Sequence, residues 1–305
     1  MDAMGEESET SVGTLGRLRE EYAPFYKEFR HTLRLVWKSP LTLMGFVIFI
    51  GLVLAAALAP YLAPYDPYEI RLDITFQPPN MEHPFGTDEM GRDILSRVLW
   101  GSRISLRVGL VVVGISLCIG TILGSLAGYL GGLVDEVIMR FTDLVLAFPS
   151  IILALALAAA LGPSLDNAMI AICATWWPWY ARLVRGQVLS VREAGFVEAA
   201  KCIGASDIRI LFRHILPNSF GPVIVNASMD FGWTILTLAA LGFLGIGAQP
   251  PQPEWGLMIN IGRTYFLEKP WMALFPGLAI LIIVLGSNLM GDGLGEILNP
   301  RLRRR

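Results

Sequence analysis

The chain has 305 residues, of which 54% are hydrophobic and only 16% are charged, with a formal net charge of −2 and a mean hydropathy of +0.55. Ordinary soluble domains carry about 25% charged residues, so this composition argues against a soluble protein and indicates a membrane protein. The three cysteines are Cys118 and Cys173, in predicted spans, and Cys202, on the predicted cytoplasmic side; an odd count in those places argues against a disulfide framework and a metal cluster, and we interpret them as packing residues.

Five long runs of the chain contain no Asp, Glu, Lys or Arg. Each reaches the roughly 20 residues that cross about 30 Å of hydrocarbon, and they are 41–65, 108–134, 144–165, 231–253 and 270–291. A shorter apolar segment, 167–181, contains Pro178, which transmembrane helices tolerate, and it supplies the return crossing that its neighbours need. We therefore predict an all-α membrane protein with six spans, at about 40–63, 105–130, 137–161, 166–186, 219–247 and 271–292.

The basic residues are distributed unevenly between the two sides that six spans define. One side holds 17 Lys and Arg residues and the other holds 7, which accounts for all 24. Because cytoplasmic loops carry the excess of basic residues, this bias predicts that both termini are cytoplasmic. The forty or so polar residues before the first apolar run also argue against a cleavable signal peptide.

The predicted spans divide the chain into segments that lie on alternate sides of the membrane. These are a cytoplasmic N-terminal segment (1–38), a first transmembrane helix (39–64), an external loop or subdomain (65–104), a domain with the five remaining helices (105–298) and a cytoplasmic tail (299–305). A cytoplasmic loop, 190–218, lies inside the long domain.

Glycine recurs at every fourth position in and just after the second predicted span, at Gly120, Gly124, Gly128 and Gly132. Rows of small residues at this spacing let the backbones of two membrane helices approach closely. The row therefore predicts tight helix packing rather than a phosphate-binding loop.

The pattern of residues in the cytoplasmic loop (190–218) predicts two short amphipathic helices with a glycine between them. The apolar positions Phe196, Ala199, Ala200 and Ile203 have helical spacing, and so do Ile208, Leu211, Phe212 and Ile215. Gly204 permits a sharp change of direction, and Pro217 suits the start of the next helix. Two interpretations are open: a hairpin lying on the membrane, or a knob inserted into a partner's groove. Leu211 and Phe212 would then anchor the knob, and Glu198, Arg209 and Arg213 would form its polar rim.

Catalytic and ion-coupled functions receive little support from the residues. The histidines His31, His83 and His214 lack metal-ligand spacing, and none of the four lysines follows the glycine that a phosphate-binding loop needs. Asp230 is the one acid predicted well inside a span, and a single acid is weak evidence for a proton relay. It either contacts substrate or pairs with a neighbouring helix.

The external segment 86–93 brings three acids together, but they lack the alternation of a calcium loop. We predict instead a surface helix capped by Thr87 or Asp88, with Ile94, Leu95, Val98 and Leu99 on its apolar face, and a loop position for His83.

Four stretches carry a family resemblance that covers about residue 35 to the end. EAAKCIGASDIRILFRHILPN (198–218) resembles the EAA loop of ATP-binding-cassette importer permeases, in the form found in the dipeptide/oligopeptide group. HPFGTDEMGRDILSRVLWGSRISL (83–106) is similar to the external signature of that group's C-type subunit. FLGIGAQPPQPEWGLMI (243–259) and NLMGDGLGEILNPR (288–301) occupy the expected places around the last two spans.

The resemblance implies a type I importer permease fold in the cell membrane, with no cofactor, metal or nucleic-acid partner. It implies a homologous second permease as a heterodimer partner, two cytoplasmic ATPase subunits and an extracytoplasmic solute-binding protein. The chain itself would not be an enzyme, because ATP hydrolysis would take place on the partner subunits.

The resemblance also implies roles for individual residues. ATPase coupling would fall to Glu198, Ala199, Ala200, Gly204, Ala205, Ile208, Leu211, Phe212, His214, Leu216 and Pro217. The external signature, which would contact the binding protein or guard the pore mouth, comprises His83, Phe85, Gly86, Thr87, Asp88, Gly91, Arg92 and Asp93. Trp233 and Asp230 are candidates for the substrate path.

The chain departs from the family pattern at Leu238, Gly242, Gly295 and Asn299, where relatives commonly carry Glu, Ser, Arg and Asp. The expected substrate is a peptide or similar small solute, and the alternatives within the group are nickel complexes, glutathione and oligosaccharides. An ion-coupled secondary transporter and a membrane-bound enzyme are the rivals from other classes.

Overall fold

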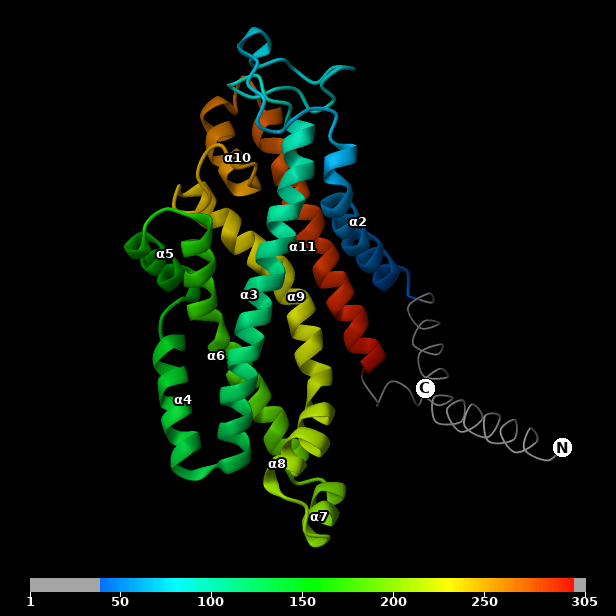
Figure 1. Ribbon diagram of the computed structural model, residues 1–305, viewed down its shortest axis with the longest axis vertical. Helices are drawn as coiled ribbons and strands as arrows, with labels where there is room; N and C mark the ends of the chain where they lie inside the picture. The colour runs from blue at the N-terminus through cyan, green and yellow to red at the C-terminus, as the bar shows by residue number, and fades with distance from the viewer. Residues whose placement is uncertain (1–38, 299–305) are drawn as a thin grey trace, which may run out of the picture.

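The computed structural model describes residues 39–298 as an elongated bundle of helices with a loop-rich cap at one end (Figure 1). The cap consists of residues 63–93 and 244–270. Within these residues there are helices and one isolated bridge, between Thr87 and Asp93, but no β-strand. The predicted all-α class is therefore confirmed. The predicted N-terminal segment (1–38), with His31, and the predicted tail (299–305) lie outside the described residues.

Four helical segments are long and apolar enough to cross a membrane, and a bent pair raises the number to five if it counts as one crossing. The four are α2 (Pro40–Leu62), α3 (Ile94–Leu130), the continuous segment Asp207–Phe243 and α11 (Trp271–Leu298). The bent pair is α4 (Gly132–Leu146) with α5 (Ser150–Leu161). The remaining helices are α6 (Leu165–Arg192), α7 (Gly195–Cys202) and α10 (Trp255–Gly262), with short turns η1 (Leu72–Ile74) and η3 (Arg263–Tyr265).

The third predicted span, 137–161, is not one helix. It breaks after Leu146, and α4 and α5 meet at an angle of 83°. Pro149 sits at the break, where it lacks a backbone N–H and disfavours a helical conformation at Phe148. Proline is tolerated within membrane helices, so composition alone did not indicate the break.

The second span begins earlier than predicted. The apolar residues of the expected surface helix (Ile94, Leu95, Val98 and Leu99) and the span expected at 105–130 form one helix of 37 residues, α3. Its N-cap is Asp93, whose carboxylate accepts a 2.7 Å hydrogen bond from the Ser96 N–H, so the prediction of Thr87 or Asp88 as the cap was wrong.

The second amphipathic helix of the cytoplasmic loop is not a separate element. It starts as α8 (Asp207–Ile210), widens into the π-helical turn η2 (Leu211–Ile215) and continues as α9 (Leu216–Phe243). Pro217 would otherwise clash with the carbonyl group four residues earlier, and a widened turn immediately before it relieves that conflict.

The glycine row of α3 packs against α6, as predicted for three of its four members. A Cβ at Gly120 or Gly124 would overlap Tyr180 or Ala181, and one at Gly128 would lie 3.0 Å from the Arg185 carbonyl oxygen. Gly132 lies outside the row, since it begins α4 with a positive φ and no neighbour within 4 Å. Because these three glycines have no side chains, the backbones of α3 and α6 can come into contact.

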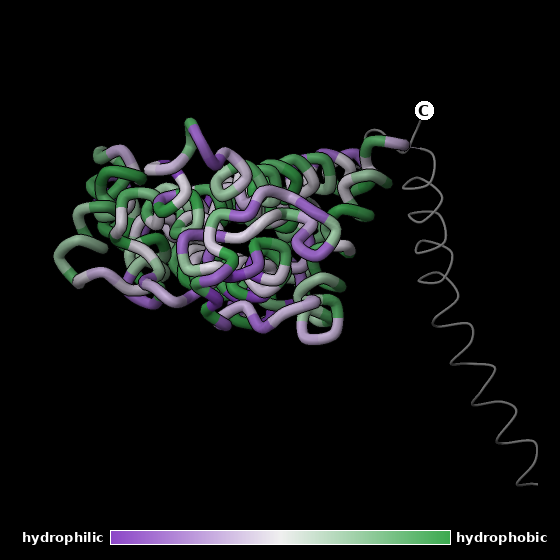
Figure 2. The backbone as a smooth tube through the Cα atoms, turned by 90° about the horizontal axis from the view of Figure 1, so that it is seen from above, coloured by the Kyte–Doolittle hydropathy of each residue, from purple (hydrophilic) through white to green (hydrophobic). Residues whose placement is uncertain are grey.

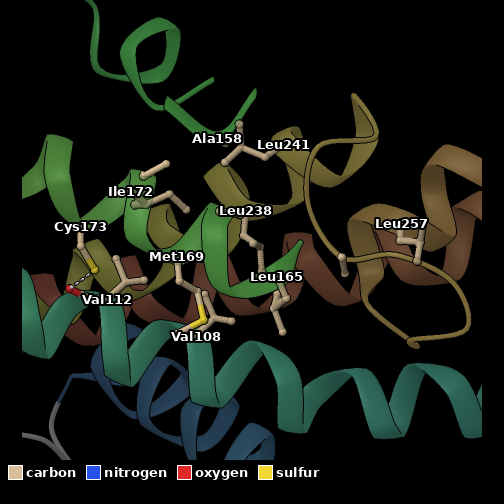
Figure 3. Close-up of a cluster of buried hydrophobic side chains, with 13 residues drawn as sticks. Val108, Val112, Ala158, Leu165, Met169, Ile172, Cys173, Leu238, Leu241 and Leu257 are labelled. Atoms are coloured by element: carbon tan, nitrogen blue, oxygen red, sulfur yellow. Dashed lines mark hydrogen bonds between the residues drawn. The ribbon is translucent and has the colours of Figure 1, made fainter. Parts of the chain in front are cut away.

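An apolar core fills the bundle next to this contact (Figure 3). It joins Val108 and Val112 of α3 to Met169 and Ile172 of α6 and to Leu238 of α9, all buried. Cys173 is buried at its edge, whereas Cys118 and Cys202 are exposed, and all three cysteines are free.

The cap closes one end of the bundle with polar loops, which face the viewer in Figure 2 in front of the more hydrophobic helices. Glu254 lies in the cap and is the N-cap residue of α10. Its two carboxylate oxygens accept 2.8 Å hydrogen bonds from the Gly256 and Leu257 N–H groups. Burial raises the pKa of Glu254 to about 7, although these two N–H groups oppose the shift.

Replacing Gly124 with alanine should destabilise the α3–α6 contact, because the new methyl group would overlap the Ala181 carbonyl oxygen. We expect the free energy of unfolding to fall by about 1–3 kcal/mol. Gly114→Ala in the same helix is the matched control, since a Cβ there has nothing within 4 Å. Thermal denaturation in detergent measures both, and equal stability of the two variants would contradict this account of the packing.

The raised pKa of Glu254 predicts a pH dependence of stability. The folded chain holds the Glu254 proton more tightly than the unfolded chain, so the stabilisation is complete below about pH 4.5 and is lost as the pH rises through 7. Relative to Glu254→Gln, the wild type should lose about 1–3 kcal/mol between pH 4.5 and 8. Thermal denaturation across this range measures the difference, and Glu82→Gln, an exposed carboxyl of the cap, should leave the profile unchanged.

Candidate functional site

The residues singled out by the sequence lie in three places along the bundle. The external signature lies in the cap, Asp230 and Trp233 line a cavity along the helices, and the loop 190–218 forms a projection at the opposite end (Figure 1). We call this projection, residues 195–215, the knob.

In the cap, His83 lies in a loop, as predicted, and its side chain is buried. Its Nδ1 lies 2.9 Å from Oδ1 of Asp93, whose other oxygen caps α3. Gly86 and Gly91 have φ values of +74° and +72° and approach the backbones of Gln77 and Arg71. Only glycine adopts this conformation readily where no room exists for a side chain.

A buried network of charges connects the cap to α3. Arg92 Nε donates to Asp88 at 2.7 Å, and its guanidinium also donates to Glu89 at 2.7 Å. Arg97 Nε lies 3.6 Å from the same Asp88 carboxylate, and Arg97 donates to the Pro67 carbonyl oxygen at 2.8 Å. Burial, followed by the charge of Asp88, raises the pKa of Glu89. Both arginines are therefore occupied within the chain.

The external signature thus builds the cap instead of forming its outer surface. Phe85 is half-buried and its ring stacks on Phe275 of α11, with centroids 4.0 Å apart. The other seven residues are all buried: His83, Gly86, Thr87, Asp88, Gly91, Arg92 and Asp93. Within residues 39–298, no three His, Cys, Asp or Glu side chains gather in a way that could hold a metal ion.

The predicted coupling residues divide between the bundle and the outside. Glu198, Ala199, Gly204, Ile208, Phe212 and Pro217 are exposed, Ala205 and His214 are half-buried, and Ala200, Leu211 and Leu216 are buried. Leu211 packs into the bundle with 8% of its surface exposed, so it is not available as an anchor for a partner, whereas Phe212 is 65% exposed. The large apolar side chains of the knob that are exposed are Phe196, Ile203, Ile208 and Phe212.

Contacts from α7 and α8 also hold the knob against the bundle. Val197 of α7 is fully buried in a cluster with Val184 and Val188 of α6. The Tyr129 hydroxyl, at the end of α3, donates a 2.6 Å hydrogen bond to Asp207. Between α7 and α8, Gly204 has a φ of +79°, which supports the predicted change of direction.

A cavity of about 570 Å³ lies between α5, α6 and α9. Asp230 and Trp233 line it from α9, and the side chains that join them are Ser150, Trp176, Trp179, Tyr180, Arg182, Leu183 and Asn226. Positions 176, 179, 180 and 183 follow the spacing of a single helical face, so the pattern could have located this wall from the sequence.

Two known families match the chain. Residues 120–304 match the family described as binding-protein-dependent transport system inner membrane component. Residues 28–79 match the N-terminal transmembrane domain of oligopeptide transport permease C. Together the two matches include the cap's first residues, the cavity and the knob.

Individual relatives are similar over most of their length. A probable D,D-dipeptide transport system permease protein of Escherichia coli (strain K12) is 51% identical over 271 residues, covering 88% of this chain and 91% of the relative. A dipeptide transport system permease protein of Alkalihalophilus pseudofirmus is 47% identical, covering 90% of each. A glutathione transport system permease protein of Pectobacterium atrosepticum is 46% identical, covering 84% and 86%. The chain therefore belongs to the family of inner membrane components of binding-protein-dependent transport systems.

Proposed function

We propose that the chain is the transmembrane permease subunit of an ATP-driven importer that moves short peptides into the cytoplasm. The observation that carries this proposal is the knob, whose exposed apolar side chains project from the end of a bundle in a chain of this transport family. The names of the relatives support dipeptides or similar peptides as substrates, and the glutathione permease supports that tripeptide as the second candidate.

The knob is the proposed docking element for a cytoplasmic ATPase subunit. Phe196, Ile203, Ile208 and Phe212 would enter an apolar groove, while Glu198, Arg209 and Arg213 form its polar rim. An amphipathic helix laid into a groove is a common mode of recognition, and exposed aromatic residues are effective anchors. Of the two anchors expected from the sequence, Leu211 and Phe212, the proposal keeps Phe212, because Leu211 is buried in the bundle.

The proposed topology has six crossings with both termini in the cytoplasm. The bent pair α4–α5 provides one crossing and α6 another, although α6 carries Arg182 and Arg185. Asp143 of α4 pairs with Arg182 at 2.7 Å and Asp135 of α4 pairs with Arg185 at 2.5 Å, and pairing makes such charges tolerable close to a membrane. The knob is then on the cytoplasmic side, in agreement with the bias of basic residues.

The proposed assembly contains a homologous second permease, two ATPase subunits and an extracytoplasmic binding protein. Closure of the ATPase pair would move the knobs together and switch the spans between inward-facing and outward-facing states, as a rigid-body transition. The cap would receive the binding protein, and the buried charge network gives it the rigid shape that a docking surface needs.

Uptake should depend on a separate ATPase and not on an ion gradient. In proteoliposomes containing the complete importer, we expect uptake of a labelled dipeptide to stop when the catalytic glutamate of the ATPase subunits is replaced. A protonophore should leave the initial rate unchanged. Uptake that persists without ATP hydrolysis, or that collapses with the protonophore, would instead identify an ion-coupled transporter.

Truncation of Phe212, the more exposed of the two exposed aromatic residues of the knob, should separate docking from folding. Phe212→Ala should reduce co-purification of the ATPase subunits about tenfold or more while leaving thermal stability unchanged, because Phe212 is 65% exposed. Phe266→Ala is the matched control, since Phe266 is 52% exposed but lies in the external loop after α10. Normal ATPase binding by the Phe212 variant would contradict the proposed docking surface.

A further inference from the structure

The cavity between α5, α6 and α9 has a composition unlike that of the apolar core beside it. Three tryptophans, Trp176, Trp179 and Trp233, provide aromatic surface, and Asp230 and Arg182 contribute opposite charges. Its volume of about 570 Å³ falls in the range of small-molecule sites, about 300–1,000 Å³. Trp179 and Trp233 are both more than half exposed, so the cavity opens at the side of the chain.

Asp230 has no cationic side chain as an ion-pair partner in the part of the chain that the structure describes. It is half-buried near the middle of α9. The buried Tyr180 lines the same cavity, and a phenol supplies no positive charge to Asp230. An acid at this depth in a membrane helix is costly and is usually paired or part of a substrate path.

Arg182 brings the complementary charge to the same cavity. Its Nη2 donates one hydrogen bond, at 2.7 Å, to Asp143 of α4, and its side chain is half exposed. A guanidinium has five N–H donors, so this bond leaves others available for a carboxylate ligand. The cavity therefore presents an acid and a base at its wall, with aromatic surface beside them.

We propose that this cavity is a subsite for a short zwitterionic peptide in transit, with Asp230 binding the α-ammonium group. Arg182 binds the terminal carboxylate, and the tryptophans contact the peptide side chains. An α-ammonium supplies the charge that Asp230 lacks, and the aromatic faces favour a cation nearby. An oligosaccharide would stack on the tryptophans but would leave Asp230 without a cationic partner. This inference rests on the proposed function and names the chemistry by which the permease holds its substrate.

The test compares two peptides that differ only at the N-terminus. The assembled importer without its binding protein, in nanodiscs, is titrated with alanyl-phenylalanine and with N-acetyl-alanyl-phenylalanine, and tryptophan fluorescence reports binding. We expect the wild type to bind the free peptide about tenfold or more tightly than the acetylated one, as for one charge-assisted hydrogen bond. In Asp230→Asn the two affinities should agree within about twofold.

Asp166→Asn is the matched control, because Asp166 is an exposed acid at the other end of α6 that pairs with Arg107. It should keep the wild-type preference. A wild type that binds both peptides equally or neither, or an Asp230→Asn variant that keeps the preference, would overturn the subsite. If the Asp230→Asn variant does not assemble, the proposal is still tested by whether the wild type binds the free peptide more tightly than the acetylated one.

A second experiment distinguishes failure of the subsite proposal from failure of the proposed function. With the binding protein added, wild-type importer should hydrolyse ATP and take up dipeptide when reconstituted in proteoliposomes. ATP-driven uptake without any preference for the free N-terminus would refute only the subsite. A complete importer that fails to take up dipeptide would refute the proposed function itself.

Discussion

The contact between α3 and α6 determines how the rest of the molecule is arranged. Three glycines of α3 let the backbone of α6 approach until Tyr180, Ala181 and Arg185 touch it. Without a strong hydrophobic driving force between helices inside a lipid bilayer, such close packing is a main source of helix association. The α6 residues at this contact also supply Tyr180 to the cavity wall and the valines Val184 and Val188 to the cluster that holds α7. The cavity and the knob thus share one support.

Much of the architecture follows from periodicity and composition, whereas the features that differ depend on contacts distant in sequence. Long apolar runs predicted the helical class, and the spacing of Gly120, Gly124 and Gly128 predicted a tight interface. The break at Pro149 did not follow, because membrane helices often accommodate proline through their neighbours. The burial of His83 did not follow either, since it requires Asp93 and α3 to fold back beside it.

The knob illustrates how one apolar stripe can serve two surfaces. Helical spacing groups Ile208, Leu211, Phe212 and Ile215 together, and the sequence alone gives no reason to separate them. In the structure, Leu211 and Ile215 face the bundle, while Ile208 and Phe212 face outward. A stripe wider than a single contact can bind the bundle with one edge and leave the other edge free. Sequence could therefore identify the segment but not the side chains available to a partner.

The continuity of α8, η2 and α9 has a mechanical consequence. The helix that carries Ile208 in the knob also carries Asp230 beside the cavity, 22 residues further along the same chain. At about 1.5 Å per residue, the two positions are about 33 Å apart on one rod with no intervening loop. A push, tilt or twist applied at the outer end is transmitted along this lever arm, except for what the π turn and Pro222 absorb. A force exerted on the knob is therefore transmitted to the wall of the cavity through a single helix.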